Sequence, residues 1–158
     1  MKQIGLKTAD GRWIARRVRV ARTFRQRLRG LLGTRSLGSE EGLMLSPGGS
    51  VHTFGMRYRI DVAFLDRQLK ILRVAPQLCP WRICRAPAKT RHVLELPAGA
   101  ALKLQLRENT FVCIDHDLPA RTATCSRLST QHDDLKFSLR IPPSARRQRA
   151  AAEHRDAG

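Results

Sequence analysis

The residues with the greatest potential for chemistry lie in the middle of the chain: His52, Met56, Arg57 and Asp61. In an extended strand alternate side chains face the same way, so His52 and Met56 would share a face unless Gly55 forms a bulge. Arg57 and Asp61 would share a face in the same way. Arg57 could form a buried, bidentate ion pair with a carboxylate, which we favour, or it could bind an anionic ligand in a cleft.

No catalytic set can be recognised around these residues. His52 could act as a general base or a metal ligand, but no serine–histidine–acid order, nucleophile elbow or pair of catalytic carboxylates accompanies it. The turn-forming run at 47–50 lacks the lysine and the following helix of a phosphate-binding loop. We therefore predict no catalytic residue, and the sequence favours a protein that is not an enzyme.

The cysteines give little indication of a metal site. They are Cys79, Cys84, Cys113 and Cys125. Histidines at 92 and 116 could join them around zinc, but the tight Cys-x-x-Cys pairing that is typical of zinc sites is absent. The N-terminus has no apolar export segment, and no apolar run approaches the about 18 residues of a membrane span. We expect free thiols in a cytoplasmic protein, with no disulfide, metal or other cofactor.

The chain is strongly basic, with 30 Lys and Arg against 13 Asp and Glu and a net charge of +17. A basic surface attracts polyanions through Coulomb forces that salt screens, although a solvated arginine-rich face is the plainer interpretation. The residues that would bind a polyanion are Arg16, Arg17, Arg19, Arg22, Arg25 and Arg29. Few aromatic side chains accompany them, so weak, nonspecific nucleic-acid binding is the most that this segment predicts.

Hydrophobic periodicity predicts mostly β-structure and one clear helix. A rough alternation over 14–20 indicates a first strand. The next segment has an apolar stripe with helical spacing, made of Phe24, Leu28, Leu31 and Leu32. We predict that this helix begins after an N-cap at Thr23 and ends at Gly33, which can adopt a left-handed conformation.

Two hairpins are predicted in the centre of the chain. The first joins 43–45 to a strand that starts at Val51, through the turn residues between them. The second joins the alternating run at 58–64 to 69–74. Residues 76–89 show neither a helical nor a strand period and are expected to form a long ordered loop or a lid.

The remaining predicted elements lie at 92–114, and the residues after them form a tail. Strand character returns at 92–96 and 111–114, whereas 100–106 suits either a strand or a helix and both options stay open. We divide the chain into an N-terminal extension at 1–12, a single β-rich domain at 13–116, and a basic tail at 117–158. The tail has too few apolar residues to offset the entropy of ordering and is expected to be disordered.

Four segments, in this order, resemble a known family. They are GLM at 42–44, SVHTFGMRYRIDVAFLD at 50–66, LKILRVAP at 69–76 and HVLELPAG at 92–99. Together they resemble the bacterial and archaeal family called domain of unknown function 192. The resemblance implies a compact α+β fold that is mostly β, either a β-sandwich or a half-open β-barrel with one or two short helices. It implies no established biochemical activity.

The chain departs from the family pattern at several positions. Asn109 and Thr110 stand where the family has Gly-Asp; Asn109 can keep the positive φ of a glycine, but Thr110 has no carboxylate. Arg59 replaces a proline, and Gly48 replaces a frequent cysteine. Any chemistry that depends on the family residues at these positions would be lost here.

The favoured hypothesis is a non-enzymatic β module that binds a small ligand or a protein partner. The long loop at 76–89 suggests a groove beneath it, because clefts under such loops commonly bind ligands. The expected ligand-binding residues are His52, Met56, Arg57, Asp61 and Trp81. The alternative is nonspecific polyanion binding through the N-terminal arginines and the tail, and an enzyme of unknown reaction is a distant third.

Overall fold

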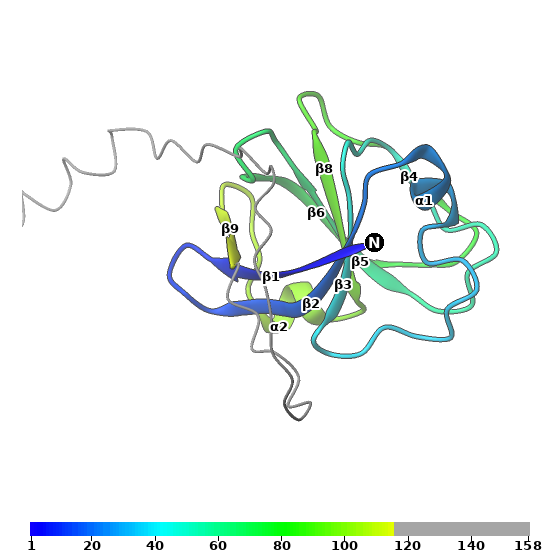
Figure 1. Ribbon diagram of the computed structural model, residues 1–158, viewed down its shortest axis with the longest axis horizontal. Helices are drawn as coiled ribbons and strands as arrows, with labels where there is room; N and C mark the ends of the chain where they lie inside the picture. Colours follow the sequence, from blue (N-terminus) through cyan, green and yellow to red (C-terminus); the bar gives the residue numbers. More distant parts are fainter. Residues whose placement is uncertain (116–158) are drawn as a thin grey trace, which may run out of the picture. The chain divides into compact units, whose positions relative to one another are not determined.

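A computed structural model describes residues 1–115 of the chain, so the expected tail at 117–158 lies outside the described residues. The described part is mostly β, with a seven-stranded sheet that curls into a half-barrel and two short helices (Figure 1). Its elements are β1 (Lys2–Thr8), β2 (Trp13–Ala21), α1 (Phe24–Arg29), β3 (Glu41–Leu45), β4 (Val51–His52), β5 (Ile60–Leu65), β6 (Ile71–Leu78), β7 (Ile83–Cys84), β8 (His92–Pro97), α2 (Ala100–Lys103) and β9 (Val112–Asp115). The expectation of a half-open barrel with short helices is confirmed.

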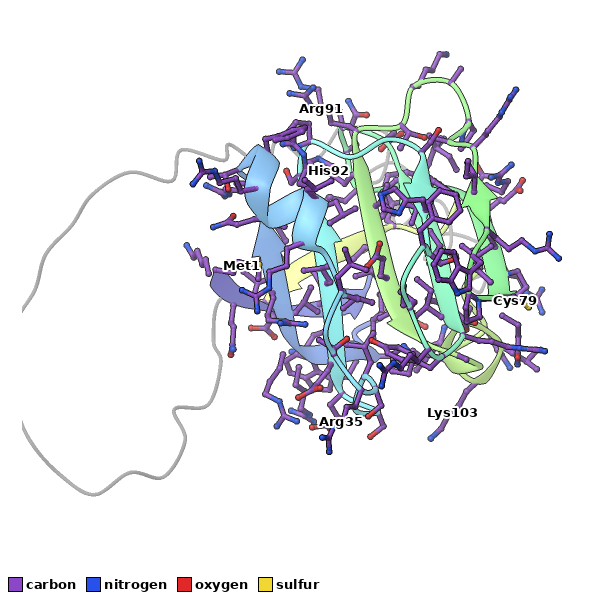
Figure 2. The ribbon with its side chains drawn as sticks, turned by 90° about the vertical axis from the view of Figure 1, so that its right-hand side faces the viewer. Met1, Arg35, Cys79, Arg91, His92 and Lys103 are labelled. Carbon is purple, nitrogen blue, oxygen red and sulfur yellow. The ribbon has the colours of Figure 1, made fainter. Side chains whose placement is uncertain are left out.

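The large sheet has the strand order β6-β5-β8-β3-β2-β1-β9, and only β2 and β3 run parallel. An isolated bridge between Lys70 and Phe111 and a hydrogen bond from the Ile71 amide to the Thr110 carbonyl (2.8 Å) join the two edges at one end. At the other end Met1 and Cys79 lie on opposite sides of the ribbon (Figure 2). The barrel is therefore closed at one end only.

Both faces of the sheet are buried, which explains the nearly continuous apolar runs of its central strands. The concave face contributes alternate residues such as Val20, Met44, Ala63 and Leu94 to one core cluster. The opposite face contributes their chain neighbours, which are Ala21, Leu45, Phe64 and Val93, to a second cluster. The second cluster is covered by residues from the connections rather than by a long helix.

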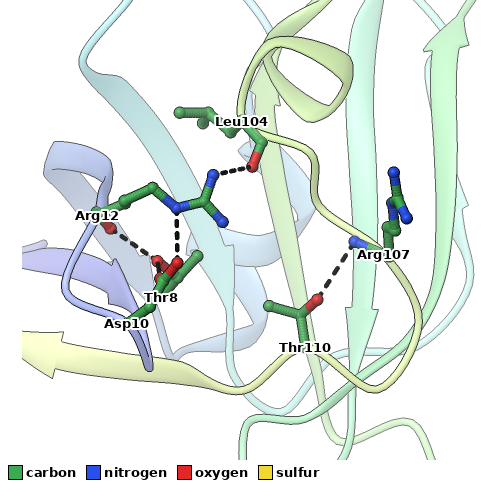
Figure 3. A network of polar contacts seen from close by, with 6 residues as sticks. All are labelled: Thr8, Asp10, Arg12, Leu104, Arg107 and Thr110. Carbon is green, nitrogen blue, oxygen red and sulfur yellow. Dashed lines mark hydrogen bonds and ion pairs between the residues drawn. The ribbon is translucent and has the colours of Figure 1, made fainter.

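The sheet begins earlier in the chain than the sequence analysis expected. Residues 1–12 were assigned to an extension, but Lys2–Thr8 forms β1, which pairs with both β2 and β9. Ile4 and Leu6 of this strand are buried in the core. The strand was not predicted because the polar residues around these two interrupt its apolar pattern. The turn into β2 is held by Arg12, whose guanidinium binds Asp10 (2.8 Å) and the Leu104 carbonyl (3.3 Å; Figure 3).

Helix α1 is shorter than predicted, although its start is correct. Thr23 is the N-cap, and its hydroxyl accepts a hydrogen bond from the Gln26 amide (3.3 Å) within a capping box. The helix ends at Gly30, with a φ of 46°, rather than at Gly33. The predicted stripe does not pack as a unit, because Phe24 is 71% exposed while only the residues beyond the helix reach the core.

One predicted hairpin is wrong and the other is confirmed. β3 pairs with β2 and β8, and β4 pairs with β7 in a separate two-stranded sheet, so no hairpin joins β3 to β4. β5 and β6 form the expected antiparallel hairpin. The segment at 76–89 is not a plain loop, since it contains the end of β6 and the whole of β7.

The open choice at 100–106 is resolved by the short helix α2 at its start. Beyond it, Asn109 has a φ of 68°, which confirms that asparagine keeps the left-handed conformation expected for glycine. The Thr110 hydroxyl accepts a hydrogen bond from the Arg107 amide (3.4 Å; Figure 3), so it stabilises a local turn.

Candidate functional site

A groove of about 200 Å³ lies between α1 with its following turn and the segment that connects β3 to β4. We call it the α1 groove. Its lining combines apolar side chains, glycine backbone and a few polar groups, as is common in ligand sites. It is lined by Phe24, Arg27, Leu28, Arg29, Gly30, Leu31, Leu32, Leu45, Pro47, Gly48, Gly49, Ser50, Val51, His52, Met56 and Glu95.

Glu95 gives the groove its distinctive chemistry. This residue lies in the middle of β8 and is only 5% exposed, yet within residues 1–115 its carboxyl group forms neither a hydrogen bond nor an ion pair. Burial raises the pKa of Glu95 to about 7, and the positive charge of Arg19 opposes this rise only in part. A buried carboxyl group without a partner is costly, and strongly perturbed acids in clefts are frequent at functional sites.

Two residues from the sequence prediction, His52 and Met56, line the same groove as Glu95. They do not lie on one strand face, because β4 ends at His52 and Gly55 turns the chain with a φ of 77°. Met56 is buried, whereas His52 is exposed and stacks on Phe54, with ring centroids 5.3 Å apart. Among the described residues, the contact recorded for the His52 ring is this stacking.

Ser50 also lines the groove, but the arrangement is not a catalytic triad. The Ser50 hydroxyl accepts a hydrogen bond from the Ala86 amide (3.1 Å). Among the described residues no hydrogen bond joins Ser50, His52 and Glu95 to one another. A nucleophile needs a base within hydrogen-bond reach, so this geometry supports binding better than covalent catalysis.

Gly48 brings the wall of the groove against β8. A Cβ atom at this position would lie 2.7 Å from the Val93 amide nitrogen and 2.9 Å from the Leu45 carbonyl oxygen. The Gly48 amide donates a hydrogen bond to the Arg91 carbonyl (2.8 Å), which fixes this approach. The cysteine that the family resemblance suggested for this position would not fit the present backbone.

The favoured ion pair of Arg57 with a carboxylate is not present. Arg57 is exposed and forms no ion pair within the described residues. Asp61 is buried and instead accepts hydrogen bonds from the backbone amides of Gln77 (2.8 Å) and Ala101 (2.7 Å). These two amides provide the hydrogen bonds that the buried carboxylate needs, so it does not require a guanidinium partner. Asp61 therefore stabilises the fold, and it does not line the α1 groove.

Trp81, which the sequence analysis placed at a groove under the 76–89 segment, does not line the α1 groove. The indole is 67% exposed and lies beside the Phe54 ring, with centroids 6.0 Å apart. His52, Phe54 and Trp81 therefore form a row, which we call the aromatic row. The sequence did not predict this row, because Phe54 and Trp81 lie on turns and turns have no regular alternation of apolar and polar residues.

The arginines proposed for polyanion binding are not equivalent. Arg16 and Arg17 form ion pairs with Glu40 (3.1 Å) and Glu41 (3.5 Å), and Arg16 also lies over the Trp13 ring. Arg19 is half-buried in the sheet. The remaining three are exposed and unpaired among the described residues: Arg22, Arg25 and Arg29.

The cysteines that the structure describes are free thiols, namely Cys79, Cys84 and Cys113. Across residues 1–115 no group of three or more His, Cys, Asp and Glu side chains could hold a metal ion. Neither helix in this part of the chain has the length and apolar character needed to cross a membrane.

Sequence reasoning missed Glu95, although a signal was present. An acidic residue at the centre of the apolar run VLEL is unusual, because a strand buried on both faces leaves no solvated side for a charge. The pattern of this run therefore predicts that the Glu95 side chain lies among buried neighbours.

The described residues form a small β-rich module, and its α1 groove contains a buried acid. The chain belongs to the family DUF192, described as an uncharacterized ACR family, whose sequence model matches residues 6–114. This match confirms the resemblance found in the sequence.

Two relatives carry the name UPF0127 protein. A UPF0127 protein of Thermococcus sibiricus is 31% identical over 59% of this chain and 62% of its own length. A UPF0127 protein of Pyrococcus horikoshii is 42% identical over 32% of this chain and 43% of its own length. The chain thus spans less than two thirds of each of these relatives.

Two crystal structures share the fold. A protein of unknown function from Novosphingobium aromaticivorans has a TM-score of 0.60 at 22% identity, covering 70% of this chain and 82% of its own. A protein from Sinorhizobium meliloti, described as a proposed transcription regulator, has a TM-score of 0.64 at 21% identity, covering 71% and 92%. At these identities the similarity establishes the architecture alone.

Proposed function

We propose that this protein binds a small molecule in the α1 groove through the Glu95 carboxyl group, as a module that carries out no reaction of its own. The observation that carries the proposal is the buried, unpartnered carboxyl group at the groove, with its pKa raised to about 7. A ligand that donates a hydrogen bond to Glu95 would provide the partner that residues 1–115 do not supply.

The groove favours a compact ligand with a donor group and an apolar part. Met56 and Leu45 provide apolar contact beside Glu95, while Arg27 and Arg29 add positive charge to the lining. An ammonium or amidinium group would bind the ionised carboxylate most strongly, because charge-assisted hydrogen bonds are roughly twice as strong as neutral ones. We propose an amine-bearing molecule in the cytoplasm, where free thiols such as Cys79 persist.

The test is a thermal-shift screen of small amines, guanidines and alcohols against the wild-type protein, Glu95→Gln and Glu40→Gln. Glu40 is exposed, so its substitution controls for the loss of one negative charge. A ligand should raise the melting temperature of the wild-type protein and of Glu40→Gln but have no effect on Glu95→Gln. An unchanged response in a well-folded Glu95→Gln protein would exclude this site.

Proton release gives a second readout. Because about half of Glu95 is protonated near its pKa of about 7, an ammonium ligand that selects the carboxylate should release a proton on binding. Titration calorimetry in two buffers of different ionisation enthalpy measures that proton directly. Binding without proton release at this pH would show that the ligand does not contact Glu95 in its ionised form.

A second candidate function is nonspecific polyanion binding by the N-terminal arginines. It is favoured by the exposure of Arg22, Arg25 and Arg29 around α1, and by the absence of Asp and Glu from residues 11–39. It is weakened by the ion pairs that Arg16 and Arg17 already form. The affinity for heparin should fall steeply with salt if this surface binds polyanions, and a flat salt dependence would dispose of the idea.

A further inference from the structure

The aromatic row is a rigid, solvent-facing structure that neither core cluster explains. The His52 and Phe54 rings are stacked with an interplanar angle of 22°, and the Phe54 and Trp81 rings are tilted by 38°. Phe54 is 42% and Trp81 67% exposed. Burial of apolar area cannot account for aromatic rings that remain this open to solvent.

Thr53 locks the backbone that presents these rings. Its side chain is fully buried, and its hydroxyl donates to the Cys79 carbonyl (2.7 Å) and accepts from the Arg82 amide (3.0 Å). Its backbone carbonyl accepts a hydrogen bond from the Trp81 amide (3.1 Å). The turns that carry Phe54 and Trp81 are therefore tied to one residue, which holds the two rings in a fixed relation.

The backbone at Trp81 is also unusual. Its φ of 61° lies in the left-handed region, which bulky residues rarely adopt. Such a conformation persists only where the surroundings impose it, and Thr53 supplies those contacts. The indole is thus held outward by the fold at a cost in backbone strain.

The two segments that carry the row are basic. Residues 51–60 and 76–86 contain four arginines and no Asp or Glu: Arg57, Arg59, Arg82 and Arg85. All four are exposed, and none forms an ion pair within residues 1–115. Exposed aromatic faces flanked by unpaired arginines match the chemistry of an unpaired nucleic-acid strand, whose bases stack and whose phosphates are anionic.

We propose that the aromatic row binds single-stranded nucleic acid, with bases stacked on Phe54 and Trp81 and phosphates held by Arg82 and its neighbours. This surface shares His52 with the α1 groove, whereas Phe54 and Trp81 do not line that groove. Stacking is tolerant of sequence because every base has a π-face, so the site should select strand state rather than base identity. A duplex keeps its bases stacked within itself and offers only its phosphates.

The test measures the binding of a fluorescein-labelled oligothymidylate of about 12 nucleotides, a length within the usual range of single-strand sites. Trp81→Ala should weaken binding by about tenfold or more, as expected for the loss of a stacked base. Phe111→Ala is the matched control, because Phe111 is 45% exposed and lies outside both the row and the α1 groove, and it should bind like the wild-type protein. A duplex of the same length should bind more weakly than the single strand.

A spectroscopic readout separates stacking from simple charge attraction. In a Trp13→Phe background Trp81 is the remaining tryptophan, and its fluorescence should be quenched when unlabelled oligothymidylate binds. Arg82→Gln should retain quenching but reduce the slope of affinity against salt concentration by about one phosphate contact.

Three outcomes would overturn the proposal. They are binding without quenching of Trp81, equal losses in Trp81→Ala and Phe111→Ala, and the absence of oligothymidylate binding at low salt. The last outcome would favour a protein partner for the exposed rings. Trp81→Phe retains an aromatic face and should bind better than Trp81→Ala, which guards against a loss caused by misfolding.

Discussion

Arg19 on β2 and Glu95 on β8 face the same side of the sheet, with Leu43 of β3 directly between them. Two strand spacings, about 10 Å in total, separate their backbones. Arg19 is half-buried and attracts the Glu95 carboxylate, but no ion pair joins the two side chains in the described part of the chain. Burial therefore outweighs the attraction, and the pKa of Glu95 rises to about 7.

Glu95→Gln should change how stability depends on pH. The pKa of Glu95 rises from 4.5 to about 7 on folding, so the folded protein binds this proton more tightly. The resulting stability is fully present below pH 4.5 and is lost as the pH rises through about 7. The loss amounts to about 3 kcal/mol. Above this range Glu95→Gln should be more stable than the wild-type protein, as measured by urea unfolding.

The control for this prediction is Glu40→Gln, which removes an exposed carboxylate and should leave the pH dependence between pH 4.5 and about 7 intact. If Glu95→Gln and the wild-type protein lost stability in parallel over this range, the carboxyl group of Glu95 would have to be solvated or paired, and the raised pKa would be wrong.

His92 should act in the opposite direction. Burial, and next the charge of Arg91, lower the pKa of His92 below 6.5, while Asp66 opposes this shift. The imidazole Nδ1 lies 3.0 Å from the Ser46 hydroxyl oxygen, and its buried Nε2 has no hydrogen-bond partner within residues 1–115. The folded protein favours the neutral imidazole, so the contribution of His92 to the free energy of unfolding is fully present above pH 6.5. This contribution is lost as the pH falls through the lowered pKa that His92 has in the folded protein.

His92→Gln keeps a polar side chain beside Ser46 and removes this titration, so it should flatten the acidic loss of stability. NMR titration of the wild-type imidazole provides the direct measurement. A pKa at or above 6.5 would contradict the effect of burial.

Several strands of the sheet could be predicted because apolar and polar residues alternate along their sequences. β5 and β6 alternate and are joined by a polar turn, so their hairpin followed from local pattern. The parallel pairing of β2 with β3 could not be predicted from local pattern, because Arg17 and its partner Glu41 lie far apart in sequence and no local feature specifies their register. β1 was missed because only Ile4 and Leu6 mark its buried side.

The groove could be predicted only in part. His52 and Met56 stood out as polar or soft residues in a strand-like block, and both line it. Arg57 and Trp81 stood out equally but are exposed and do not line the groove. For Arg57 the reason is that Gly55 turns the chain, so strand alternation no longer applies. Glu95 was hidden in an apolar run, and its role depends on α1 and the β3–β4 connection, which only tertiary packing brings together.

Asp61→Ala should strongly destabilise the protein. The carboxylate holds the amides of Gln77 and Ala101, so its loss leaves two donors without their charged acceptor in a buried site. Charge-assisted hydrogen bonds of this kind contribute about 1.5 to 3 kcal/mol each, which gives a loss of about 3 to 6 kcal/mol for the two. Chemical unfolding measures it.

Asp66→Ala is the matched control for Asp61. Its carboxylate also accepts from two backbone amides, those of Gln68 (2.8 Å) and Lys70 (2.9 Å), but it is half-exposed and water can replace it. We expect a loss of about 1 kcal/mol. Arg57→Ala should change stability by less than about 0.5 kcal/mol, as is usual at exposed sites. A large loss of stability in Arg57→Ala would indicate that Arg57 forms an ion pair after all, in contradiction to its lack of one within residues 1–115.

Gly48→Ala should destabilise the protein and alter the α1 groove. The new methyl group would meet the Val93 amide at 2.7 Å and the Leu45 carbonyl oxygen at 2.9 Å, and both atoms belong to the backbone of paired strands. The segment at 46–50 must therefore move away from β8, at a cost of about 1 to 3 kcal/mol that is typical of overpacking. Gly49→Ala is an almost identical change one residue later, where a methyl group would meet nothing within 4 Å. Thermal unfolding should separate the two variants clearly, and equal melting temperatures would mean that Gly48 is not pressed against β8.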